Sequence, residues 1–312
     1  MEIREAVVLC AGLGTRMRPL SDRVPKPCLP FLNRPLLHWT LDALAAAGVR
    51  RVLLNLHHLP QEVAACARAH GGELELRFSS EPEILGTAGV FWPVRGMLKG
   101  EAFFVVNGDL FGDLPLGPLA ERLEREPACL AALAVRPLPP GAAYTPIEAD
   151  GLGVLREFGR GASHFTGVYA ARRELLERLP GPGFRELVRD LLRPLLPSGV
   201  VHAVDSRGRW YDLGSPSAYL AASLELLSLM AEGGFAVPRG SRLERRDGRP
   251  LLRHEGAWVS RDASVTGPAV AGEGAKVPAR CQVGRCVLLP GTALAVGERL
   301  EDAVALDALR AP

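Results

Sequence analysis

Short apolar runs alternate with helix-like patterns along the first 230 residues, and this alternation constrains the fold more than any other feature. Ala6–Ala11 and Phe103–Val106 are apolar at every position, as expected for strands that helices cover on both faces. Between them, leucines from Leu36 to Leu44 recur with helical spacing. Repetition of strand, helix and strand predicts an α/β fold with a doubly wound, mostly parallel (Rossmann-like) sheet.

The same pattern gives bounds for further elements. Between residues 144 and 170, glycine-rich joints separate short strands, which indicates an antiparallel lobe beside the sheet. Strands are predicted at Arg51–Leu56, Leu74–Phe78, Leu130–Val135 and Val200–Val204, and helices at Pro60–Ala69, Thr87–Met97, Leu116–Glu126, Arg172–Leu179, Phe184–Leu195 and Ser215–Met230.

The last eighty residues have a different composition. Residues 233–250 are charged and rich in glycine and proline, so they are predicted to link a domain at 1–232 to an appendage at 251–312. Val259 and Val265 are six positions apart, as are Val277 and Val283, with small residues between them. This spacing predicts a short left-handed parallel β-helix, each coil having three short faces. The alternative is an irregular β-rich tail.

A tail of this length can form only a few coils, which bury little apolar surface by themselves. Trp258, Leu288 and Leu289 would therefore need another surface, and we expect the tail to contribute to self-association as a homo-oligomer.

Composition excludes several classes of function. The net charge of +2 over 312 residues gives no basic field, so neither nucleic-acid nor anionic-membrane binding is expected. There is no apolar run long enough for a transmembrane helix, and the charged N-terminus lacks a signal core, so a cytoplasmic location is predicted. The six cysteines are scattered without a CxxC pair, which favours buried free thiols over a zinc site.

A glycine-rich loop carries the densest chemical signal. Gly12 and Gly14 follow the first predicted strand, where their backbone N–H groups could surround phosphates, and Arg16 and Arg18 add charged donors. Neither the dinucleotide fingerprint nor the P-loop pattern fits. A tight turn without ligand is the alternative explanation.

Lys26 stands between Pro25 and Pro27, which are expected to hold the chain extended around it. Only three of the 37 basic residues are lysines, so a lysine here carries more information than usual. A compact ammonium can reach one phosphate oxygen where a planar guanidinium would not fit. The alternative is a solvated loop lysine.

Two carboxylates end apolar stretches far apart in the sequence. Asp109 follows the strand predicted at Phe103–Val106, and Asp212 precedes the last predicted helix. Ligands of open α/β sheets bind beyond the carboxyl ends of strands, and paired carboxylates suit a Mg²⁺ that bridges phosphates. Alternatively, each carboxylate caps the turn or helix that follows it. Glu81–Gly89 opens another predicted helix, whose glycines would allow a flat ring or a ribose to approach closely.

These motifs together resemble the signature of the sugar-1-phosphate nucleotidylyltransferases. The resemblance rests on Gly12–Leu20 with Pro25–Pro27, on Glu81–Gly89, which is similar to the family's E-x-P-L-G-T-A-G, and on three shorter matches. Those shorter matches are Asn107–Asp109, Phe165–Tyr169 and Trp210–Gly214. It covers residues 1–230, and the tail resembles the β-helix that many members carry.

The resemblance implies a Mg²⁺-dependent enzyme that joins an NTP to a sugar 1-phosphate, with pyrophosphate as the other product. The sugar phosphate would attack the α-phosphorus in line, and catalysis would rest on positioning and charge neutralisation. The implied site residues are Arg16 and Lys26 for catalysis; Cys10, Ala11, Gly12, Gly14, Thr15, Glu81, Gly86 and Thr87 for the nucleotide; Asn107, Glu157, Arg160, Thr166 and Gly167 for the sugar phosphate; and Asp109 and Asp212 for the metal.

One departure bears on the substrate. The family usually carries a lysine in an F-x-E-K-P segment that holds the sugar phosphate, but the corresponding 155–161 stretch has none, leaving Arg160 or Arg156 as substitutes. The Glu81–Gly89 segment and the tail resemble those of mannose-1-phosphate guanylyltransferases, and this resemblance favours GTP with mannose 1-phosphate. The alternatives are UTP with N-acetylmuramate 1-phosphate, UTP or TTP with glucose 1-phosphate, and a catalytically silent regulatory subunit that binds NDP-sugars.

Overall fold

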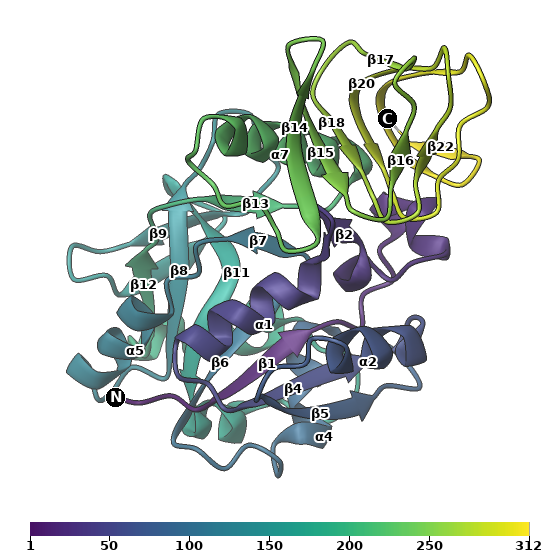
Figure 1. Cartoon of the computed structure of the whole chain (residues 1–312). Coiled ribbons are helices and arrows are strands. Elements are labelled where there is room, and N and C mark those ends of the chain that lie inside the picture. The colour runs from purple at the N-terminus through teal and green to yellow at the C-terminus, as the bar shows by residue number, and fades with distance from the viewer. Residues whose placement is uncertain (312) are drawn as a thin grey trace. The chain divides into compact units, whose positions relative to one another are not determined.

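The computed structural model describes residues 1–311, and its chain forms two compact units (Figure 1). The first consists of Met1–Gly12 and Leu37–Trp210, and the second of Leu13–Leu36 with the chain from Tyr211 onward. The glycine-rich loop therefore begins in one unit and continues in the other. Within residues 1–311, no helix is both long enough and apolar enough to cross a membrane.

The first unit contains most of the α/β elements. Its strands are β1 (Glu5–Leu9), β4 (Arg51–Leu56), β5 (Glu75–Ser80), β6 (Ala102–Asn107), β7 (Leu110–Gly112), β8 (Ala131–Pro137), β9 (Pro146–Ala149), β10 (Leu155–Phe158), β11 (Ser163–Arg172) and β12 (Val201–Asp205). Its helices are α1 (Leu36–Ala46), α2 (Pro60–Arg68), α3 (Gly86–Gly89), α4 (Phe91–Val94), α5 (Leu116–Arg125) and α6 (Arg193–Leu195), with 3₁₀ turns η4 (Arg173–Arg178) and η6 (Leu196–Ser198) and a π-helical turn η5 (Leu187–Leu192).

A nine-stranded sheet forms the centre of this unit, in the order β10-β9-β11-β6-β1-β4-β5, with β8 beside β11 and β12 beside β8. The strands β6, β1, β4 and β5 are parallel, as predicted for the repeated strand–helix–strand pattern. The long strand β11 runs antiparallel to β6, β8 and β9. The sheet is therefore mixed, which corrects the expectation of a mostly parallel one, because the antiparallel lobe joins the main sheet.

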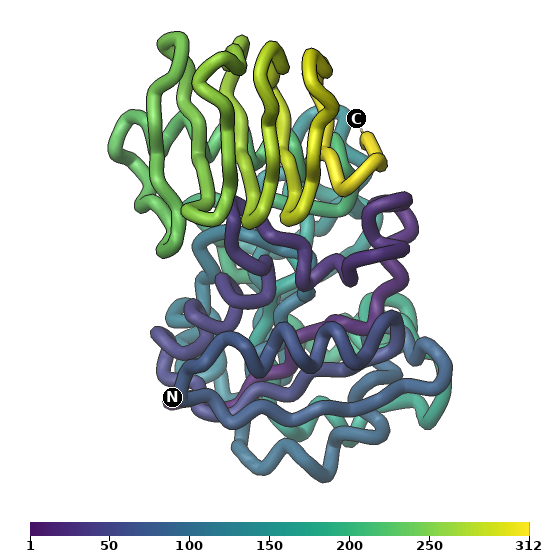
Figure 2. Tube along the Cα trace, turned by 45° about the vertical axis from the view of Figure 1, so that its right-hand side comes forward, coloured from purple at the N-terminus to yellow at the C-terminus, as the bar shows by residue number. Residues whose placement is uncertain are grey.

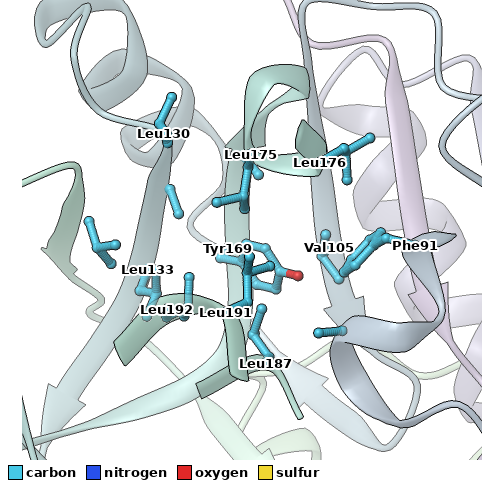
Figure 3. Packing of buried hydrophobic residues seen from close by; sticks show 14 of the residues in the cluster. Phe91, Val105, Leu130, Leu133, Tyr169, Leu175, Leu176, Leu187, Leu191 and Leu192 are labelled. Carbon is cyan, nitrogen blue, oxygen red and sulfur yellow. The ribbon is translucent and has the colours of Figure 1, made fainter. Parts of the chain in front are cut away.

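The core of the first unit lies around β11. Figure 3 shows Tyr169 of β11 among Phe91, Val105, Leu187 and other apolar side chains, and all of these residues are buried. The phenol oxygen of Tyr169 is buried and has no hydrogen-bond partner among the described residues. Burial also raises the pKa of this phenol well above its usual range. The core thus contains one polar group whose hydration is lost without replacement.

The second unit combines the N-terminal loop segment with the C-terminal strands. Its elements include η1 (Thr15–Met17), η2 (Leu20–Asp22), η3 (Lys26–Cys28), β2 (Pro30–Phe31), β3 (Arg34–Pro35), α7 (Pro216–Ala231), β14 (Ser241–Arg246), β15 (Arg249–His254), β16 (Trp258–Val259), β17 (Ser264–Val265), β18 (Ala269–Ala271), β19 (Lys276–Val277), β20 (Gln282–Leu288), β21 (Arg299–Leu306) and β22 (Leu309–Ala311), while β13 (Trp210–Asp212) begins at the boundary.

The tail winds through successive parallel coils, which Figure 2 shows in green to yellow. Leu251 of β15 pairs with Ala269 of β18, which pairs with Cys286 of β20, and this residue pairs with Ala303 of β21. Successive partners are thus 17 or 18 residues apart, about three sides of six. The predicted valines also pair across coils, Val259 with Val277 and Val265 with Val283.

Two expectations about the tail differ from the structure. The range 233–250 contains β14, which forms an antiparallel pair with β15, so it is more than a linker. Of the three residues expected to need another surface, Leu288 and Leu289 are each 1% exposed, whereas Trp258 is 56% exposed. Leu288 belongs to the buried apolar cluster of the tail, which the six-residue pattern alone did not indicate.

Helix α7 belongs to the same unit as the tail. The hydroxyl of Ser215 accepts a hydrogen bond from Ala218 N–H, which caps its N-terminus. The helix packs against β15, β18, β20 and β21 and has buried residues on most of its faces. The hydroxyl of Tyr219 donates to the carbonyl of Pro30, and its ring packs on Phe31, which ties α7 to the loop segment.

Candidate active site

A chain of hydrogen bonds fixes the start of the glycine-rich loop in the first unit. Cys10 N–H donates to Asn55 Oδ1 at 2.8 Å, and Asn55 Nδ2 donates to Glu81 Oε1 at 2.8 Å. The other oxygen of Glu81 accepts from Leu85 N–H at 3.0 Å. Asn55 and Glu81 are each 4% exposed. Glu81 therefore links the loop after β1 to the segment that precedes α3.

The space around the backbone is open at Gly12 in the loop and closed at Gly108, which follows β6. A Cβ built on Gly12 would have no described atom within 4 Å, so a ligand could approach the backbone there. A Cβ on Gly108 would lie 2.7 Å from the carbonyl oxygen of Leu9, so β1 and β6 meet too closely for a side chain. Burial raises the pKa of the Cys10 thiol well above its usual range, which leaves it protonated and no nucleophile at neutral pH.

The structure brings three of the expected sugar-phosphate residues together. Gly167 has a positive φ of 83°, and a Cβ there would lie 2.5 Å from Asn107 Nδ2. Thr166 is 3% exposed, and its hydroxyl donates to the carbonyl of Ala134, so it presents backbone rather than its hydroxyl. Asp109 is half-buried two residues beyond the end of β6.

The glycines of α3 accommodate another loop of the protein. Gly86 has a φ of 75°, and a Cβ there would lie 2.5 Å from the carbonyl oxygen of Arg185. That carbonyl accepts hydrogen bonds from the N–H groups of Ala88 and Gly89. The hydroxyl of Thr87 donates to Glu186 Oε2 at 2.9 Å and accepts from Leu187 N–H. Close packing of these two segments thus explains glycine here without a ligand.

A cavity of about 360 Å³ adjoins these residues, a size within the range of small-molecule sites. Its lining includes Thr87 and Asn107, both expected from the sequence. The other polar lining residues are Thr145, Glu186, Arg189 and Arg193, and the apolar ones are Phe165, Leu187 and Val188.

The expected arginines and Glu157 lie elsewhere. Arg156 binds Asp150 through Nη2 and Nε at 2.5 and 3.0 Å. Arg160 is 73% exposed with Glu148 at 3.8 Å, and Glu157 is an exposed residue of β10. None of these three lines the cavity.

Sequence reasoning did not identify Arg189 and Arg193 as site residues. A signal was present, because Arg185, Arg189 and Arg193 repeat every fourth position in a predicted helix and so share one face.

In the second unit, Lys26 is buried, with 8% exposure, which rules out a solvated loop lysine. Pro25 is extended, but Lys26 begins the turn η3, in which Cys28 N–H donates to the carbonyl of Pro25 at 2.8 Å. The expected extended conformation therefore stops one residue earlier, because this turn bond closes. A Cβ on Gly14, whose φ is 63°, would lie 3.6 Å from Lys26 Cβ.

Arg16 lies against Gly214, the last residue of the Trp210–Gly214 motif, although about 200 positions separate them in sequence. A Cβ on Gly214 would lie 2.7 Å from Arg16 Nη2, so a side chain at residue 214 would require the guanidinium to shift. Ser215, and not Asp212, caps α7, so Asp212 is not the N-cap of this helix. Thr15 and Arg16 are exposed, and Asp212 is half-buried.

Asp109 in the first unit and Asp212 in the second each offer carboxylate oxygens, which suit a hard cation. Within residues 1–311, no cluster of three or more His, Cys, Asp or Glu side chains could hold a metal by itself. A divalent ion at either carboxylate would therefore need oxygen ligands from phosphates or water to complete its coordination.

Among the proteins similar in sequence to this chain, several are named mannose-1-phosphate guanylyltransferase. The chain is 28% identical over 305 residues to the mannose-1-phosphate guanylyltransferase of Mycobacterium tuberculosis, covering 94% of this chain and 82% of that one. It is 29% identical over 237 residues to the mannose-1-phosphate guanylyltransferase catalytic subunit beta of Drosophila pseudoobscura pseudoobscura, covering 73% of this chain and 63% of that one.

A solved structure shares the fold. HddC from Yersinia pseudotuberculosis matches with a TM-score of 0.61 at 22% identity, over 72% of this chain and all of that one. The family model described as nucleotidyl transferase matches residues 5–228, which is most of the chain and includes every candidate site residue. The protein belongs to the nucleotidyl transferase family.

Proposed function

We propose that the protein transfers the GMP group of GTP to mannose 1-phosphate and releases pyrophosphate. The observation that carries the proposal is the alignment with the mycobacterial mannose-1-phosphate guanylyltransferase, which spans 94% of this chain and includes the tail. A phosphate oxygen of the sugar 1-phosphate attacks the α-phosphorus of GTP. The bond from that phosphorus to the β-phosphate oxygen breaks, and GDP-mannose and pyrophosphate form.

The nucleotide end of the proposed site uses mainly backbone. Cys10, Ala11, Gly12, Gly14 and Thr15 would surround the nucleotide, and the open space beside Gly12 supports close approach. Glu81, Gly86 and Thr87 belong to the segment proposed to lie by the base and ribose. Their present hydrogen bonds and packing support a positioning role, in which Glu81 holds the Cys10 loop through Asn55.

Arg16 and Lys26 carry the charge neutralisation in this proposal. Lys26 is 8% exposed, and a buried ammonium interacts with a phosphate more strongly than one in water. Its place in η3, close to Gly14, supports a fixed position, so little reorganisation accompanies the reaction. Arg16 offers a planar guanidinium suited to the β- and γ-phosphates.

We further propose Asp109 and Asp212 as carboxylate ligands of Mg²⁺. When bound, the ion neutralises phosphate charge and polarises the α-phosphate. At the sugar end, Asn107 and the backbone of Thr166 and Gly167 would contact the sugar, and their closeness to each other supports this assignment.

Pyrophosphate release with four NTPs and a panel of sugar 1-phosphates tests the proposal. We expect the highest kcat/KM for GTP with mannose 1-phosphate. Higher kcat/KM with UTP and N-acetylmuramate 1-phosphate, or with UTP or TTP and glucose 1-phosphate, would overturn the substrate assignment. Binding of NDP-sugars without turnover of any pair would favour a regulatory subunit.

Asp109→Asn tests the metal assignment. The variant should lose most of its turnover at saturating Mg²⁺ while keeping its fold, because the carboxylate lies beyond a strand end. Asp205→Asn is the matched control, since Asp205 is an exposed carboxylate at the end of β12. Equal activity in the two variants would contradict the role of Asp109.

The tail supports two further proposals. Parallel pairing every 17 or 18 residues favours a left-handed β-helix at residues 251–312, appended to a catalytic region at 1–232. The exposed indole of Trp258 favours self-association through this appendage. We also propose a cytoplasmic location for the protein. Light scattering of Trp258→Glu against the wild type tests the association, and an unchanged subunit number would contradict it.

A further inference from the structure

The cavity beside Asn107 contains both anionic and cationic groups. Glu186 lines it and accepts a hydrogen bond from Thr87, and the cationic residues of the lining are Arg189 and Arg193. Carboxylate, hydroxyl and amide groups bind sugar hydroxyls, and a guanidinium binds a phosphate through paired N–H donors. A cavity of about 360 Å³ with both kinds of group suits a sugar phosphate.

The two arginines of the cavity differ in charge compensation. Arg189 binds Asp190 through Nε and Nη2, both at 2.7 Å, and this pairing lowers the pKa of Asp190 to about 2. The charge of Arg189 is therefore already neutralised. Arg193 forms no ion pair among residues 1–311, and its Nη2 donates to the carbonyl of Phe158 at 3.1 Å. A guanidinium has five N–H donors, so most of those on Arg193 remain for a ligand.

The hydrogen bond from Arg193 to Phe158 places the guanidinium next to the segment in which the family carries its lysine. Phe158 ends β10 and lies within residues 155–161, the stretch in which the resemblance places a phosphate-binding lysine that this chain lacks. Arg193 begins α6, far along the chain, yet its guanidinium reaches the backbone at the end of β10. The nearer arginines have other partners, Arg156 with Asp150 and Arg160 with Glu148, and neither lines the cavity.

We propose that Arg193 binds the phosphate of the sugar 1-phosphate, and so takes the place of the missing lysine. This inference rests on the proposed function and names a substrate-binding residue for it. The hydrogen bond to Phe158 fixes one edge of the guanidinium, and its remaining N–H groups, arranged as a planar fork, can bind two phosphate oxygens. Glu186 and Asn107 lie in the same cavity as partners for sugar hydroxyls.

Calorimetric titration of mannose 1-phosphate into Arg193→Gln, compared with the wild type, tests the proposal without requiring turnover. We expect the dissociation constant to rise at least about tenfold, because a charge-assisted bidentate contact is lost. Arg193→Lys keeps the charge but not the fork, so its affinity should fall between the two. Arg178→Gln, an exposed arginine of η4 outside the cavity, is the matched control and should bind as the wild type does.

Steady-state kinetics then separate binding from structure. In Arg193→Gln, the KM for the sugar 1-phosphate should rise while the KM for GTP changes less than about twofold. Loss of the Phe158 contact alone would lower the urea midpoint without this selective change. Unaltered sugar-phosphate affinity in Arg193→Gln, or the loss appearing in Arg160→Gln instead, would overturn the assignment.

The two proposals fail in different ways. Turnover of another NTP and sugar-phosphate pair by the wild type would overturn the substrate assignment, and the Arg193 titration would then use that sugar 1-phosphate. Wild-type turnover with no effect of Arg193→Gln on sugar-phosphate affinity would overturn the role of Arg193 alone.

Discussion

Glu81→Gln should destabilise the protein although the two side chains have nearly the same shape. The hydrogen-bond chain runs from Cys10 N–H through Asn55 to Glu81, and Leu85 N–H meets Glu81 from the other end. Because a backbone donor stands at each end, one member of the chain must accept on both sides. A carboxylate does so, whereas a glutamine offers one oxygen and one NH₂ group.

No rotation of the amides repairs the substituted chain. If the oxygen of the introduced glutamine faces Asn55, its NH₂ group meets Leu85 N–H. If both amides turn over, the two donors that meet are Asn55 Nδ2 and Cys10 N–H. One buried donor is unsatisfied in every arrangement, and a hydrogen bond to a charged group is lost, which together cost about 2–3 kcal/mol.

Urea unfolding followed by circular dichroism gives the change in the free energy of unfolding. Glu83→Gln is the matched control, because Glu83 is an exposed carboxylate two residues away and should change stability by less than about 0.5 kcal/mol. In a double-mutant cycle with Asn55→Ala, the coupling energy should exceed about 0.5 kcal/mol. Equal stability of the Glu81→Gln and Glu83→Gln variants would refute the reasoning.

Three other substitutions probe the chemistry and the core. Lys26→Arg should lower kcat more than GTP affinity, measured by rapid kinetics and titration, because the larger planar group does not fit the buried position; an unchanged kcat would contradict this. Tyr169→Phe should be neutral or stabilising by up to about 1 kcal/mol in urea, since it removes an unsatisfied buried hydroxyl, and a clear loss would show a missed partner. Burial lowers the pKa of His164 below 6.5, so the unfolded chain binds the proton more readily and stability falls as the pH drops through 6.5. His164→Gln should lose less stability than the wild type between about pH 8 and about pH 5.5, and equal losses would argue against this titration.

Elements with strong local signals were predictable from the sequence. The strand at Arg51–Leu56 has the predicted bounds, and its apolar residues Val52–Leu54 and Leu56 are buried on both faces of the sheet. The last helix, predicted at Ser215–Met230, spans Pro216–Ala231, and Ser215 caps its N-terminus. Among site residues, Asn107 and Gly167 were expected to share a function and do lie together.

Features that depend on distant contacts were not predictable in this way. The glycines of α3 were interpreted as room for a ligand, whereas Gly86 meets the backbone of Arg185, 99 positions later. Nothing in a local window shows which segment will arrive there. The antiparallel direction of β11 has the same origin, because the glycine-rich joints indicated a lobe but not the strand of the main sheet that it would join.

The arginine bias of this chain acts in opposite directions on two inferences. With three lysines among 37 basic residues, the position of Lys26 is informative, and its burial agrees with a specific role. The same bias makes sequence proximity a poor guide to the group that replaces a lost lysine, since arginines occur near every candidate site. Charge pairing discriminates between them: a guanidinium that already binds a carboxylate has little left to offer a phosphate, whereas Arg193 keeps its charge beside the cavity. The proposal for Arg193 therefore depends on the tertiary structure, because the sequence does not show which arginines pair with carboxylates.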